Sequence, residues 1–102
     1  MANKTKTIGI IDVNTDVIEK DRSFKNAYVF CIKLSDEPDS LWKKYFQEEW
    51  KNSPYEMKRE IRVIGNELRV LFIYGENVRE HAKFAQKLVE TTNRRIDDII
   101  DR

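Results

Sequence analysis

The chain has 102 residues, a formal net charge of +1 and a mean hydropathy of -0.68, and charged residues make up 36% of it. This length predicts a single domain that buries a core without needing disulfides or metals. Because acidic and basic residues are mixed along the whole sequence, composition excludes a basic tail of the kind that captures nucleic acid or membranes.

Cysteine content and targeting signals point to the cytoplasm. The one cysteine, Cys31, excludes an internal disulfide and an all-cysteine metal site. The apolar run at residues 8–11 is too short for a signal peptide, and no stretch approaches the roughly 18 apolar residues of a membrane span. We expect a cytoplasmic protein with no cofactor and no membrane partner.

The first half of the chain predicts two strands and a helix. Residues 5–13 are rich in β-branched side chains, residues 14–16 predict a turn, and residues 17–18 resume the extended pattern. Residues 20–26 are a polar loop, and residues 28–34 alternate as a second strand. Capping residues at 35–40 start a helix that ends near residue 51, before Ser53 and Pro54. Its apolar stripe predicts that Trp42 and Trp50 are mostly core.

The clearest signal is a β-hairpin around Gly65 and Asn66, whose glycine favours a type II′ turn. This loop would set Arg62 opposite Arg69. Side chains alternate between the two faces of a sheet, so one face is continuous and apolar and is predicted to be core. Its residues are Ile61, Val63, Leu68, Val70, Phe72 and Tyr74.

A second helix follows the hairpin. Gly75 ends the strand, Asn77 caps the helix, and Glu80 stands in the capping-box position. Apolar residues keep helical spacing from Val78 to Ile100.

The predicted order is therefore β-β-α-β-β-α. We expect an α+β fold: a two-layer α/β sandwich with a four-stranded, mostly antiparallel sheet and both helices on one face, which is a permuted ferredoxin-like arrangement. The layout resembles that of small bacterial accessory proteins, although a shared fold does not assign a function.

Three residues were considered for catalysis. Asp12 ends an apolar strand, where metal-dependent phosphodiesterases can place a ligand. His81 and Cys31 have no nucleophile or base motif around them. A turn role for Asp12, a structural role for His81 and an apolar packing role for Cys31 are favoured, so we expect a protein that is not an enzyme.

The non-core face of the sheet is the first predicted interaction surface. It combines apolar side chains with two arginines, which is more typical of a protein interface than of a solvated face. Its members are Val29, Cys31, Arg62, Arg69, Leu71 and Ile73. The alternatives are an arginine pair neutralised by Glu60 or Glu67, and a weak nucleic-acid or anion site using Lys33, Arg62 and Arg69. A homodimer or a contact with another protein is favoured over nucleic acid.

The C-terminal end is the second predicted interaction surface. A helix that runs from residue 77 to the end overruns strands of six or seven residues, yet its apolar stripe continues in Ile96, Ile99 and Ile100. We expect these isoleucines to pack on a second chain or on the N-terminal extension around residues 13–18.

Overall fold

The computed structural model describes residues 7–22, 25–54 and 59–100, apart from the side chain of Ile100. Six elements follow one another in the predicted order. They are β1 (Ile10–Lys20), β2 (Ala27–Leu34), α1 (Ser40–Asn52), β3 (Ile61–Ile64), β4 (Glu67–Ile73) and α2 (Val78–Ile100).

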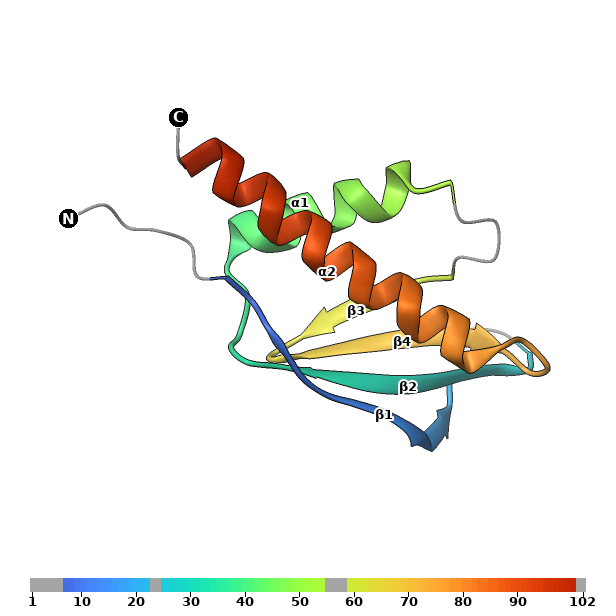
Figure 1. The fold of residues 1–102 in the computed structure, drawn as a ribbon. Coiled ribbons are helices and arrows are strands. Elements are labelled where there is room, and N and C mark those ends of the chain that lie inside the picture. Colours follow the sequence, from blue (N-terminus) through green and yellow to red (C-terminus); the bar gives the residue numbers. More distant parts are fainter. Residues whose placement is uncertain (1–6, 23–24, 55–58, 101–102) are drawn as a thin grey trace.

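The four strands form one sheet in the order β1-β2-β4-β3, and every neighbouring pair is antiparallel. Because β4 lies between them, β2 and β3 are parallel, and α1 connects them as a split β-α-β unit. The N-terminal strand completes the sheet beside β2. Both helices lie on one face (Figure 1). The α+β two-layer sandwich with a permuted ferredoxin-like order is confirmed.

The β3–β4 hairpin has the predicted register, with Arg62 opposite Arg69 and Ile64 opposite Glu67. Gly65 has a φ of 58°, as the first central position of a type II′ turn requires. Five of the six residues predicted for the core face lie in or against the core, but Tyr74 is 76% exposed. The reason is that β4 ends at Ile73, so Tyr74 lies beyond the part of the strand that the helices cover.

Helix ends and core follow the sequence closely. The Asp39 carboxylate accepts a hydrogen bond from the Trp42 backbone N–H, and the Asn77 side chain caps α2 through the N–H groups of Arg79 and Glu80. The core fills the space between sheet and helices. Its largest fully buried side chains on the helix side include Trp42, Phe46, Phe30, Ile32, Leu34 and Leu68.

Strand β1 differs from its predicted bounds, because it continues through the expected turn as far as Lys20. The turn lies inside the strand as an irregularity. Asn14 is opposite Cys31 while Glu19 is opposite Val29, so four residues of β1 stand against one residue of β2. The Asn14 side-chain oxygen accepts hydrogen bonds from the N–H groups of Asp16 and Val17, at 3.2 Å each. This local turn bends the strand.

The N-terminal segment of the chain contacts the last third of α2 at Asn93. A helix of 23 residues is about 34 Å long, while the seven residues of β4 extend about 23 Å. Beyond the strands, the Asn93 amide donates to the Ile8 carbonyl at 2.7 Å and its oxygen accepts from the Ile8 N–H at 3.1 Å. The same oxygen accepts from Trp42 Nε1 at 2.9 Å. The N-terminal segment therefore packs on this end, but at Ile8 rather than at residues 13–18.

Candidate interaction surface

The sheet face that lies away from the helices holds the first set of predicted interface residues, from β2, β3 and β4. Val29 and Leu71 are each 1% exposed. Cys31, Arg62, Arg69 and Ile73 are half-buried. Both described helices lie on the opposite face, so another part of the chain must cover Val29 and Leu71.

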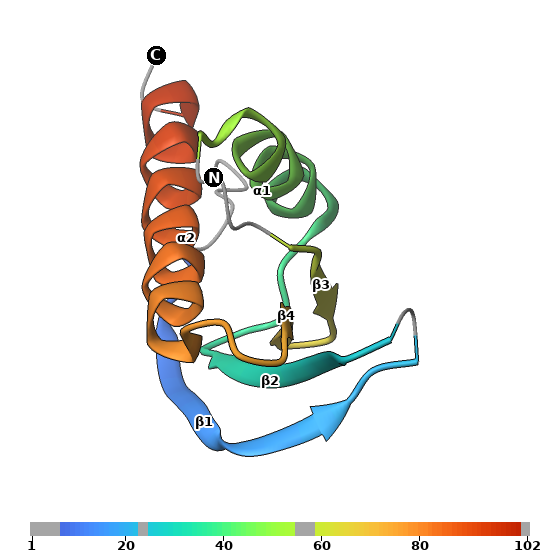
Figure 2. The ribbon, with the colours of Figure 1, turned by 90° about the vertical axis from the view of Figure 1, so that its right-hand side faces the viewer.

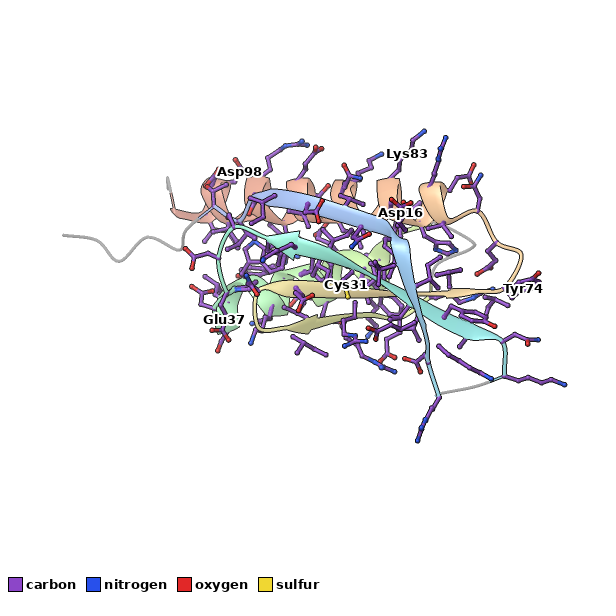
Figure 3. The ribbon with its side chains drawn as sticks, turned by 90° about the horizontal axis from the view of Figure 1, so that it is seen from below. Asp16, Cys31, Glu37, Tyr74, Lys83 and Asp98 are labelled. Atoms are coloured by element: carbon purple, nitrogen blue, oxygen red, sulfur yellow. The ribbon has the colours of Figure 1, made fainter. Side chains whose placement is uncertain are left out.

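The segment that crosses this face is residues 17–21, which comprise the end of β1 and the next residue, Asp21, and which we call the β1 arm. Figure 2 shows β1 on the side of β2 that faces away from the helices. Figure 3, which looks at that side of the sheet, shows the strand bending near Asp16 and then crossing in front of its neighbours. In a flat sheet β1 and β3 would be about 14 Å apart, yet Asp21 on the arm contacts Arg62 on β3 at 3.0 Å.

Ion pairs join the arm to both arginines. Glu19 Oε2 is 2.9 Å from Arg69 Nη2, and Asp21 Oδ2 is 3.0 Å from Arg62 Nη1. Glu60 also forms an ion pair with Arg62, at 2.8 Å. This is one of the two carboxylates that the sequence suggested as partners of the arginines. The hydrogen bond to Glu60 is the largest cause that raises the pKa of Arg62 above its ordinary value. Two like charges that face each other across a hairpin are thus offset by carboxylates.

Cys31 lies on this face beside Glu67. Burial, and next the negative charge of Glu67, raise the pKa of the Cys31 thiol above its ordinary value. A thiol with a raised pKa stays protonated near neutral pH and is a poor nucleophile. The residue is suited to packing, which is the role that the sequence favoured.

The isoleucines at the end of α2, which form the second set of predicted interface residues, differ in their exposure. Ile96 is 3% exposed and belongs to the core, Ile99 is 38% exposed, and the side chain of Ile100 lies outside the described residues. Arg95 fixes this end of α2 to α1 through Glu48 at 2.8 Å and Glu49 at 3.0 Å. The hydrogen bond to Glu48 is the main cause that raises the pKa of Arg95.

Three large exposed apolar residues lie on β1. Ile11 is 61% exposed, Val17 is 58% exposed and Ile18 is 44% exposed. Strand β1 forms one edge of the sheet. Register shifts at residues 10–12 and 14–19 interrupt its hydrogen-bonding pattern, which disfavours the addition of a further strand through the backbone. A partner would therefore contact β1 through side chains.

His81 is held in a buried polar cluster at the start of α2. Its Nε2 lies 3.3 Å from Glu76 Oε1, and Glu76 also accepts from the Ile73 N–H at 2.7 Å and pairs with Arg59 at 2.8 Å. Burial lowers the pKa of His81, although the charge of Glu76 acts in the opposite direction. With 1% of its surface exposed, the imidazole cannot contact a substrate, so the cluster joins β4 to α2.

The remaining candidate residues lie near one end of the β1–β2 pairing. Asp12 and Lys33 are exposed and face each other across β1 and β2. Among the residues that the structure describes, no three His, Cys, Asp or Glu side chains gather closely enough to hold a metal ion. Within the same ranges, no helix has the length and apolar character needed to cross a membrane.

A groove of about 620 Å³ lies between the end of α1 and the first half of α2. Its wall carries the exposed lysines Lys83 and Lys87 together with Glu49 and Glu80, so its charge is mixed. The groove also reaches Ser53 and Pro54, which lead into residues outside the described ranges.

Comparison of the chain with protein-family models, with curated proteins and with solved structures finds no match in any of the three searches. The function must therefore be argued from the residues themselves.

Sequence reasoning missed the carboxylates of Glu19 and Asp21 and the amide of Asn93. A signal existed for Asn93, because it stands between Val89 and Ile96 on the apolar stripe of α2, where a polar side chain needs a buried partner. Glu19 and Asp21 lie in a polar segment and gave no comparable signal. Their role depends on the bend in β1.

Proposed function

We propose that the protein is a non-enzymatic interaction module or accessory subunit that self-associates through the exposed apolar side chains of β1. The observation that carries this proposal is the exposure of Ile11, Val17 and Ile18 on one edge strand. Large apolar side chains on an irregular, solvent-facing strand favour a protein contact, because covering each one stabilises an assembly by about 1.5–3 kcal/mol. The Val29 and Leu71 side chains no longer belong to the proposed surface, since the chain buries them itself.

Two other functions have weaker support. A nucleic-acid or anion site at Lys33, Arg62 and Arg69 would have to displace Glu60, Asp21 and Glu19 from the two arginines. A metal-dependent phosphodiesterase centred on Asp12 would need further ligands, and none gather there among the described residues.

Light scattering over a range of protein concentrations tests the proposal. We expect a mass above the 12.2 kDa of one chain, and a return to the monomer mass in the variant Val17→Ser/Ile18→Ser. The matched control is Ile64→Ser, which removes a 52% exposed side chain from β3 at the other edge of the sheet and should leave the mass unchanged. A wild-type mass of one chain at every concentration up to about 100 μM would overturn self-association.

A further inference from the structure

The β1 arm and the sheet face beneath it have complementary charges, as a bound peptide and its binding surface do. The sheet face has Val29 and Leu71 as its apolar floor and Arg62 and Arg69 as its charges. The arm supplies two carboxylates, from Glu19 and Asp21. Because they are two residues apart in an extended segment, they project from the same side and can both reach the arginines.

The arm is attached to β2 by only a short stretch of backbone pairing. Between Asn14 and Glu19, the register with β2 is interrupted, and the arm then pairs with β2 at Glu19 and Lys20. One further backbone bond joins the Asp21 N–H to the Ala27 carbonyl at 2.9 Å. The side chain of Glu19 is 62% exposed, whereas that of Asp21 is 10% exposed. The pair at Glu19 is in contact with water, and such ion pairs are weak and are screened by salt.

From this arrangement we propose that the sheet face beneath the β1 arm is a binding surface for an extended acidic segment of a partner protein, and that the arm occupies it as an intramolecular competitor. The partner segment carries two carboxylates two residues apart and apolar side chains beside them, as the arm does. Charge complementarity with Arg62 and Arg69 selects this chemistry. The inference deepens the proposed function by naming a partner class, and it uses the inner side of the arm rather than the exposed apolar side chains.

A peptide with the sequence of residues 14–22 is the probe. It is titrated by fluorescence anisotropy into the wild-type chain and into the variant Glu19→Gln/Asp21→Asn, whose arm has lost its carboxylates. We expect binding to the variant to be about tenfold tighter, because the competing segment has lost two ion pairs. A control peptide with glutamine and asparagine at the same two positions should bind at least about tenfold more weakly than the acidic peptide.

Two further measurements make the result decisive. Arg62→Gln added to the double variant should weaken peptide binding, and raising the salt concentration from about 0.05 M to 0.5 M should do the same. Circular dichroism of each variant confirms that it is folded, and the single variant Glu19→Gln replaces the double variant if the latter unfolds. Equal binding of the two peptides, or no binding to a folded variant, would overturn the inference. The titrations are run at protein concentrations at which light scattering gives the mass of a single chain. Self-association then does not affect peptide binding, so the two proposals can fail separately.

Discussion

The two faces of the sheet are covered by different kinds of contact. On one face the helices bury large apolar side chains such as Trp42 and Phe46, both 0% exposed. On the other face a bent strand lies over Val29 and Leu71 and is fixed by ion pairs with Arg62 and Arg69. Added salt screens ion pairs at the surface, but it does not screen apolar contacts. We therefore expect the fold to depend mainly on the helix face, and the contacts under the arm to be the ones that can change with least effect on the core.

The largest loss of stability is expected from a substitution on the helix face, at Trp42. Trp42→Ala should lower the free energy of unfolding by about 3–5 kcal/mol, because it leaves a cavity beneath α1 and removes the donor to Asn93. Urea denaturation measures the loss. Leu41→Ala, at a 37% exposed neighbour, is the control and should cost less than about 1 kcal/mol. Equal losses at the two positions would show that the helix face is not the source of stability.

Asn93 tests the polar contacts of the helix layer. Asn93→Ala removes the partner of both Ile8 backbone groups and of Trp42 Nε1. Leaving these groups without a hydrogen bond should cost about 1–3 kcal/mol. Arg94→Ala, at an exposed position on the same turn, should stay within about 0.5 kcal/mol. An Asn93 variant as stable as the Arg94 control would mean that water replaces the lost contacts.

The pH dependence of stability reports on His81. Burial lowers its pKa in the folded state below the ordinary 6.5, so the unfolded chain binds more protons as the pH falls through this range. The contribution of the neutral histidine is complete above the unfolded pKa and is lost as the pH falls towards the folded pKa. Thermal melting at about pH 7.5 and pH 5.5 should show this loss in the wild type, and His81→Gln should reduce it. An identical pH dependence in the variant would assign the effect to other groups.

The arm should give the smallest change in stability. Glu19→Gln/Asp21→Asn should lower the free energy of unfolding by about 0.2–1 kcal/mol at the exposed Glu19 pair, and by somewhat more at Asp21, whose side chain is 10% exposed. The change should shrink as salt is added. The Cys31 thiolate should react faster with a thiol reagent because the arm protects that face, and rates are compared per thiolate because, besides burial, the charge of Glu19 also raises the pKa of Cys31. The control is Glu37→Gln at an exposed position. A Cys31 reaction rate that does not respond to the double substitution would show that the arm does not open there.

Local signals predicted most of the fold because short-range physics decides it. Gly65 fixed the hairpin register, Asp39 and Asn77 fixed the helix starts, and the periodicity of each element fixed its buried face. The candidate surface was predicted less well. Val29 and Leu71 lie on the sheet face for which they were predicted but are buried, because a strand pattern says nothing about what a distant segment places above it. The exposed apolar residues Val17 and Ile18 of β1 were not among the predicted interface residues.

Two contacts depend on the tertiary structure alone. The turn at Asn14 could be read from the sequence, yet its consequence, the meeting of Asp21 with Arg62 across the whole sheet, depends on the direction of the bend. Likewise, the apolar stripe of α2 predicted a contact at Ile96, while the position of the chain at Ile8 supplied it. The physical reason is the same in both cases. Hydrogen bonds within a turn or helix act over a few residues, whereas contacts between residues 41 or 85 positions apart depend on how the layers pack.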